Sequence, residues 1–324
     1  MAKTGLLAAM LFLLPAFWSG PAQAGPVKAV ASIKPLHALV AGKLHHTDAF
    51  QFALGAGVMQ GTGEPYLIVK GGASPHQYSL KPSDARALEE AAIVFWMGPG
   101  LEQFLQRPID SLARKAIHVT MLNAPDIAKL TYREDGPLDS HAHGNEGHGH
   151  EGVDMHLWLD PGNAKAMVRH IAQMLSKASP DNAGRYAENA AALTERLDKL
   201  DTELRQVLEP VRTKPFIVFH DSYQYFEKRY GLRPAGSITV NPEVPPGARR
   251  VKEISQRIRE SGALCVFAEP QFNPRRVRTM LSSTAARPGM LDPVGAELEP
   301  GPGLYFDLMR NLARSMRDCL DRTG

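Results

Sequence analysis

The chain has 324 residues, of which 44% are hydrophobic and 22% charged, so it can bury two ordinary cores and is not a disordered protein. Its 37 Lys and Arg residues nearly balance 34 Asp and Glu residues, and neither sign forms a long run. This balance argues against nucleic acid as a partner. The 28 Gly and 25 Pro residues follow no period, which excludes a collagen-like chain and predicts many short loops.

Residues 1–24 have the pattern of a secretory signal peptide. A lysine near the start precedes the apolar stretch Gly5–Trp18, and small residues follow up to Ala24. The stretch is shorter than the roughly 20 residues that a membrane-spanning helix needs, and Pro15 interrupts it. We therefore expect Sec-type export to the periplasm with cleavage after Ala24. No cysteine lies near this position, so we expect no lipid anchor.

In the first part of the chain, short apolar runs alternate with helical patterns. We expect strands at Val27–Ile33, Ala49–Leu54, Tyr66–Val69, Ile93–Met97 and His118–Leu122, and helices at Pro35–Leu44 and at Ser83–Ala91, with Ser83 as the cap. Such alternation predicts a mostly parallel sheet with helices on both faces. We assign residues 25–180 to a first α/β lobe.

Two consecutive helices are expected near the middle of the chain. The first has Asp160 as its N-cap and runs to about Ser179. The second, Asp181–Leu208, would span roughly 42 Å at 1.5 Å per residue, so we interpret residues 181–209 as a stiff connector between two lobes. The alternative is an ordinary long helix within one domain. Its expected buried face consists of Leu193, Leu197, Leu200, Leu204 and Leu208.

Residues 210–324 resume the alternation and predict a second α/β lobe. We expect strands at Pro215–His220 and Leu264–Glu269 and helices at Tyr223–Tyr230, Ala248–Ser261, Pro274–Ser283 and Tyr305–Leu320. This lobe contains both cysteines of the expected mature chain, Cys265 and Cys319. In an exported protein a disulfide between them is the first expectation. Zinc ligation is the alternative, although no CxxC pair is present.

Histidine is concentrated in one short segment. Five of the 12 histidines lie between residues 141 and 156. The stretch Asp139–Asp154 also holds acidic residues and glycines, so we expect a mobile loop that cannot pack into a core. Its imidazoles can collect divalent metals with modest affinity, and a solubilising tract is the alternative. The histidines of this secondary site are His141, His143, His148 and His150.

Three other candidate ligands, His76, His156 and His220, have more ordered surroundings. His220 ends a buried apolar run, and open α/β sheets bind ligands outside the carboxyl ends of their strands. His76 lies in a loop rich in Gly and Pro, and His156 precedes the apolar run Leu157–Leu159. Three neutral imidazoles can hold Zn²⁺ and leave a fourth position for water or a carboxylate. A single histidine in such a place is more often an ordinary hydrogen-bonded residue than a ligand, but three of them beside a histidine-rich loop favour a ligand set.

Three carboxylates stand near these positions in the expected fold. Glu269 and Asp292 lie at loop edges of the second lobe and are candidates for the fourth ligand or for supporting the ligands. Asp221 is a candidate to accept a hydrogen bond from a histidine ring, a contact that metal-bound imidazoles need. The alternative for each is a helix cap or an ordinary surface carboxylate.

Four segments resemble, in order along the chain, the ZnuA-like zinc-binding periplasmic receptors of bacterial ABC transporters, which belong to the metal-binding cluster A-I of solute receptors. They read GASPHQYSLKPSD, DMHLWLDP, FHDSYQYFEKRYG and VFAEPQFNP, and the resemblance covers essentially the whole mature chain. It implies two α/β lobes joined by one long rigid helix, with Zn²⁺ held in the cleft and delivered to an inner-membrane ABC permease. It also implies His76, His156 and His220 as the ligands and a disulfide between Cys265 and Cys319.

The sequence departs from this family pattern at one position. Pro75 precedes His76 where some relatives carry a Glu that can reach the metal. The fourth ligand is then water or Asp292, which matches a carboxylate ligand of manganese-binding relatives. We expect a monomeric receptor that is not an enzyme. The alternatives are a receptor for manganese or another divalent metal, a zinc buffer acting through the loop, and an exported zinc hydrolase with Glu269 as base, although no HExxH motif is present.

Overall fold

The computed structural model describes residues 26–42, 57–133, 152–239, 248–272, 281 and 284–321. The expected signal peptide, the expected strand Ala49–Leu54, the loop histidines and, apart from Leu281, the expected helix Pro274–Ser283 lie outside these residues. Within the described residues, no helix combines the length and the apolar character needed to cross a membrane.

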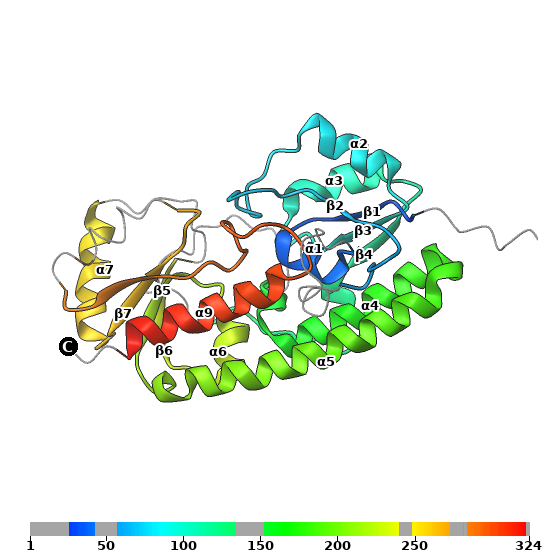
Figure 1. The fold of residues 1–324 in the computed structure, drawn as a ribbon. Helices are drawn as coiled ribbons and strands as arrows, with labels where there is room; N and C mark the ends of the chain where they lie inside the picture. The colour runs from blue at the N-terminus through cyan, green and yellow to red at the C-terminus, as the bar shows by residue number, and fades with distance from the viewer. Residues whose placement is uncertain are drawn as a thin grey trace, which may run out of the picture.

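The first lobe is built on a parallel four-stranded sheet with helices packed around it (Figure 1). The strand order is β2-β1-β3-β4, and these strands are Ala29–Ala31 (β1), Tyr66–Leu67 (β2), Ile93–Trp96 (β3) and Ile117–Thr120 (β4). The helices are Lys34–Val40 (α1), Pro82–Glu90 (α2) and Gln103–Leu112 (α3). Every residue of the central strands β1 and β3 is buried, which is why they read as continuous apolar runs in the sequence.

The second lobe repeats this topology with strand order β6-β5-β7-β8, again all parallel. Its strands are Phe216–His220 (β5), Pro234–Thr239 (β6), Cys265–Ala268 (β7) and Arg287–Met290 (β8), and its helices are Gln224–Tyr230 (α6), Ala248–Glu260 (α7) and Leu304–Leu320 (α9). Strands β6 and β8 were not predicted from the sequence. Both contain Pro and Gly, which suggest turns, but both are edge strands, where proline is tolerated.

Two long helices, α4 (Pro161–Ala178) and α5 (Ala183–Leu208), pack against each other beneath the lobes (Figure 1). The five leucines expected on the inner face of α5 are all buried. Asp160 caps α4 as expected, because its Oδ1 accepts a 2.7 Å hydrogen bond from the backbone N–H of Gly162. Ser83 does not cap α2. That helix begins one residue earlier, and Asp84 accepts the backbone N–H of Lys81 at 2.8 Å instead.

One hydrophobic core extends through both lobes. Buried side chains of α1 in the first lobe belong to the same cluster as those of α5 and of α9, the last helix of the second lobe. Figure 1 shows the N-terminal end of α9 lying beside α1, and α5 running past both lobes. A smaller cluster fills the space between the second sheet and α7. Because close-packed cores resist deformation, the shared core ties the lobes firmly together.

Cys265, the first residue of β7, and Cys319, near the end of α9, form a disulfide in the structure. The expected pairing is therefore confirmed, and neither cysteine is available as a metal ligand. The bond joins the second sheet to the helix that reaches the first lobe.

Candidate metal centre

Three histidines converge between the lobes, two of them at the end of a secondary-structure element. His76 lies in a turn of the loop between β2 and α2, and His220 is the last residue of β5. His156 immediately precedes the 3₁₀ helix η3 (Leu157–Leu159). One ligand nitrogen from each ring lies within 4.8 Å of the others, and the ring centroids are 5.0 to 5.6 Å apart. The three histidines singled out in the sequence thus lie close together in the structure.

These imidazoles line a small pocket. His156 and His220 are only 4% and 3% exposed, whereas His76 is half-buried. The pocket holds about 10 Å³, which is room for one ion or one water molecule. Its remaining walls are formed by Ser74, Pro75, Glu269, Gln271, Phe272, Pro293 and Val294. A pocket of this size suits a single ion.

The environment of His76 keeps its ring neutral. Burial lowers the pKa of His76 well below its usual range, and the neighbouring rings of His220 and His156 lower it further. A neutral imidazole has a lone pair on one ring nitrogen, and this lone pair is what a metal ion needs. By disfavouring protonation, burial therefore keeps the lone pair of His76 available to a metal ion.

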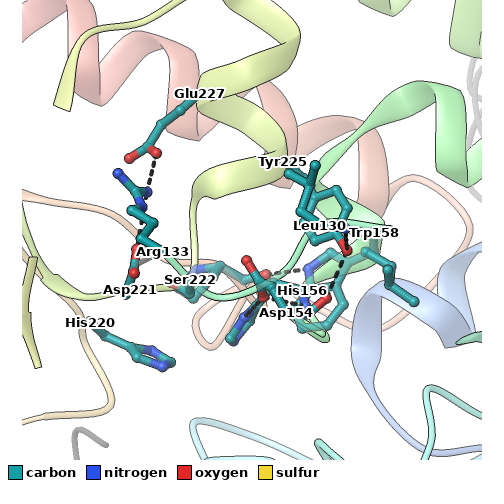
Figure 2. Close-up of polar contacts among 12 residues, drawn as sticks. Leu130, Arg133, Asp154, His156, Trp158, His220, Asp221, Ser222, Tyr225 and Glu227 are labelled. Carbon is teal, nitrogen blue, oxygen red and sulfur yellow. Dashed lines mark hydrogen bonds and ion pairs between the residues drawn. The ribbon is translucent and has the colours of Figure 1, made fainter. Parts of the chain in front are cut away.

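Asp154 fixes the orientation of His156. Its fully buried carboxylate lies 2.7 Å from Nδ1 of His156 and also accepts the backbone N–H of that residue at 3.0 Å. The ring then donates from Nδ1 and leaves Nε2 free for a ligand. The backbone of Asp154 is held in turn, since its N–H donates to Leu130 and its carbonyl accepts the hydroxyl of Tyr225, both at 2.8 Å (Figure 2).

The predicted boundary of the mobile loop was wrong, because the loop was expected to include Asp154. Gly152 accepts a hydrogen bond from the backbone of Tyr132, and Val153 forms an isolated antiparallel bridge with Thr131, so Asp154 follows residues whose backbone is paired with another segment. The spacing Asp-x-His is the sequence signal from which the contact of Asp154 with His156 could have been predicted. An Asp side chain readily accepts the backbone N–H two residues onward, and here it also reaches the ring of that residue.

Glu269 lies beside His220 at the end of the second sheet. Its Oε1 is 3.4 Å from Nδ1 of His220, which is within ion-pair range but without the alignment of a hydrogen bond. The same oxygen accepts the hydroxyl groups of Ser222 at 3.2 Å and Tyr223 at 3.0 Å. The carboxylate is itself buried. Burial raises the pKa of Tyr223 well above its usual range, and the adjacent carboxylate of Glu269 raises it further. Glu269 is thus fixed in a place where it can support His220.

Asp292, one of the two candidates for the fourth position, lies outside the histidine cluster. Its Oδ1 accepts the backbone N–H of Gly295 at 2.9 Å and of Val294 at 3.2 Å, and the amide of Gln271 at 3.0 Å. Its Oδ2 accepts the backbone N–H of Ala296 at 2.6 Å. Both oxygens are used to shape their own loop. Among the described residues the metal-ligating cluster contains three histidines and no carboxylate.

Asp221 contacts an arginine rather than a histidine ring. Its Oδ1 lies 3.0 Å from the guanidinium of Arg133, which also pairs with Glu227 (Figure 2). Burial raises the pKa of Asp221 despite this cation, and it raises the pKa of Glu227 to about 7. The expected role of Asp221 as a ring acceptor was therefore wrong. The arginine offers a charged partner that compensates a buried carboxylate better than a neutral imidazole can.

Two parallel α/β lobes sharing a long helix, with a histidine pocket between them, define a two-lobed solute receptor of the metal-binding kind. The sequence profile of the family described as "Zinc-uptake complex component A periplasmic", ZnuA, matches residues 53–319. The chain belongs to this family. It is accordingly a solute-binding receptor and not an enzyme.

Known proteins similar to the chain agree with this assignment. The high-affinity zinc uptake system protein ZnuA of Brucella suis biovar 1 (strain 1330) is 45% identical, over 96% of this chain and 98% of that protein. A crystal structure of ZnuA is 25% identical with a TM-score of 0.71, and it covers 91% of this chain and 99% of its own. A ZnuA deletion mutant with zinc bound matches at the same identity and TM-score, over 92% of this chain and all of its own.

Proposed function

We propose that the chain is a periplasmic receptor that captures Zn²⁺ with His76, His156 and His220 and delivers it to an ABC permease of the inner membrane. The observation that carries this proposal is the convergence of three imidazoles in one pocket of ionic size. The relatives named as zinc uptake proteins support the choice of cargo. No bond is made or broken in this function.

The donor set favours zinc over manganese. Imidazole nitrogen suits zinc, whereas manganese prefers carboxylate and other oxygen ligands. The cluster offers three nitrogens, and the one carboxylate expected from manganese-binding relatives, Asp292, is occupied by its own loop. We therefore assign the fourth coordination position to water. The orientation of His156 by Asp154 further favours a metal bound through Nε2.

The remaining parts of the proposal concern maturation and assembly. We infer cleavage after Ala24 and action of the mature chain as a monomer. The loop histidines His141, His143, His148 and His150 form a secondary, weaker site for the same ion. The hydrolase alternative lacks support because Glu269, its expected base, is held by the hydroxyl groups of Ser222 and Tyr223 beside His220.

The pH dependence of zinc affinity tests the proposed site. A metal-bound imidazole must be unprotonated, and the pKa of His76 lies below its ordinary value of 6.5. Protons therefore compete with zinc only in acid. We expect one tight site per chain, with affinity nearly constant from about pH 8 to pH 6.5 and falling steadily towards pH 5. Competition with a chelator of known affinity would measure this, with circular dichroism to confirm folding at each pH. An affinity that does not change down to pH 5 would exclude a histidine site.

Removing the carboxylate beside His156 tests how the site is oriented. We expect Asp154→Ala to weaken zinc binding by about 10- to 100-fold, because the ring loses the acceptor that fixes its tautomer and direction. Asp154→Asn is the matched variant: it keeps an acceptor oxygen but loses the charge, and should weaken binding less. Isothermal titration with a competing chelator would give both values. Wild-type affinity in Asp154→Ala would show that His156 needs no support from this carboxylate.

A further inference from the structure

A lysine of the first lobe is buried against a loop of the second. Lys34, the first residue of α1, is only 4% exposed. Its Nζ donates to the backbone carbonyl oxygens of Gly295 at 2.9 Å, Ala296 at 2.8 Å and Leu298 at 2.9 Å. All three protons of the ammonium group are thus used, and every acceptor belongs to the other lobe.

The loop that receives Lys34 also forms a wall of the metal pocket. Residues 293–298 follow β8, and Pro293 and Val294 line the pocket beside the three histidines. A second donor from the first lobe holds the same loop, because the indole N–H of Trp158 donates to the carbonyl of Pro293 at 2.7 Å. Asp292 fixes the loop from its own side by accepting three of its backbone N–H groups.

The charges around Lys34 support an ammonium at this position. Burial lowers its pKa, while the carboxylates of Asp292 and Glu299 favour the charged form. A charged donor makes stronger hydrogen bonds than a neutral one. Separating the loop from α1 would leave a charge and three carbonyl groups without partners until water reached them, which carries a free-energy cost.

We propose that Lys34 is a positioning residue of the metal site, whose ammonium group locks the loop 293–298 to the first lobe and thereby limits how often the pocket opens. This inference rests on the proposed zinc-binding function. Lys34 contacts none of the three histidines in the cluster, so it acts through the loop. Its expected effect is on the rate at which bound zinc escapes, because escape requires the wall formed by Pro293 and Val294 to move.

The test is the dissociation rate of zinc from the full chain, measured by stopped flow with excess fluorescent chelator. We expect Lys34→Met, which keeps the length of the side chain but removes its donors, to release zinc at least about tenfold faster without slowing association. Hydrogen exchange of the metal-free protein should rise in residues 293–298 and stay unchanged in β1 and β3. Lys70→Met is the control, since Lys70 is an exposed lysine of the same lobe whose ammonium lies over the ring of Tyr66. It should behave as wild type.

A second variant keeps the proposal testable if Lys34→Met fails to fold. Trp158→Phe removes the other donor to the loop, and it should also speed zinc release and raise exchange in residues 293–298. Wild-type release rates in folded Lys34→Met, or in Trp158→Phe if the former does not fold, would overturn the proposal. If the wild-type chain bound no zinc tightly, the proposed function would fail instead, and the exchange measurement on the loop would still decide whether Lys34 locks it.

Discussion

Replacing His220 by alanine is expected to weaken zinc binding on the order of 10²- to 10³-fold. Structural zinc sites with four protein ligands bind with about 10–16 kcal/mol, which corresponds to about 2.5–4 kcal/mol for each ligand. Of the three proposed ligands, His220 is held most rigidly, because it ends the central strand β5 and is 3% exposed. No other histidine, cysteine or carboxylate of the described residues shares the cluster with the three rings.

The matched control is His170→Ala. His170 lies on α4, half-buried and outside the cluster, so its removal takes away an imidazole without touching the pocket. Chelator competition on both variants, together with metal analysis of the purified proteins, gives the comparison. His170→Ala should keep the wild-type affinity. Equal affinities for His220→Ala and the wild type would remove His220 from the ligand set, and a large loss in His170→Ala would place the tight site elsewhere.

The histidine cluster could be predicted because two of its three residues carry a local signal in the sequence. His220 ends an apolar run that only a buried strand explains, and His156 adjoins another apolar run. Open α/β sheets bind ligands outside the carboxyl ends of their strands, so residues at such ends can be expected to lie close together even when no distance is known. Continuous apolar runs also predicted the central strands β1, β3, β5 and β7, because these strands are buried on both faces.

The parts that could not be predicted depend on contacts between distant segments. Nothing near Asp292 in the sequence shows that four N–H groups will occupy its oxygens, and nothing near Lys34 points to carbonyl groups more than 260 positions away. Asp221 was assigned to a histidine ring because the sequence places it next to His220, but Arg133 reaches it from the first lobe. The partner of a polar side chain depends on which groups lie near it in the folded chain, and hydrophobic periodicity does not predict these neighbours.

Removing the disulfide is expected to lower the free energy of unfolding by about 4 kcal/mol while leaving zinc affinity unchanged in the folded protein. The bond closes a loop with a sequence separation of 54 residues, and the loss of chain entropy in the unfolded state gives this magnitude. Cys265 and Cys319 are nearly buried, so the double replacement Cys265→Ala and Cys319→Ala avoids placing hydroxyl groups in the core. Urea unfolding of the variant and the wild type would measure the difference.

Zinc affinity should survive because the bond and the pocket lie at opposite ends of the second sheet. Cys265 begins β7, whereas Glu269, which contacts His220, follows the other end of that strand. The shared core of α1, α5 and α9 also continues to hold the lobes together without the bond. The informative comparison is therefore zinc affinity at a temperature where the variant is fully folded. A loss of affinity there would mean that the disulfide shapes the pocket through β7, and an unchanged unfolding midpoint would mean that the core and not the bond stabilises this lobe.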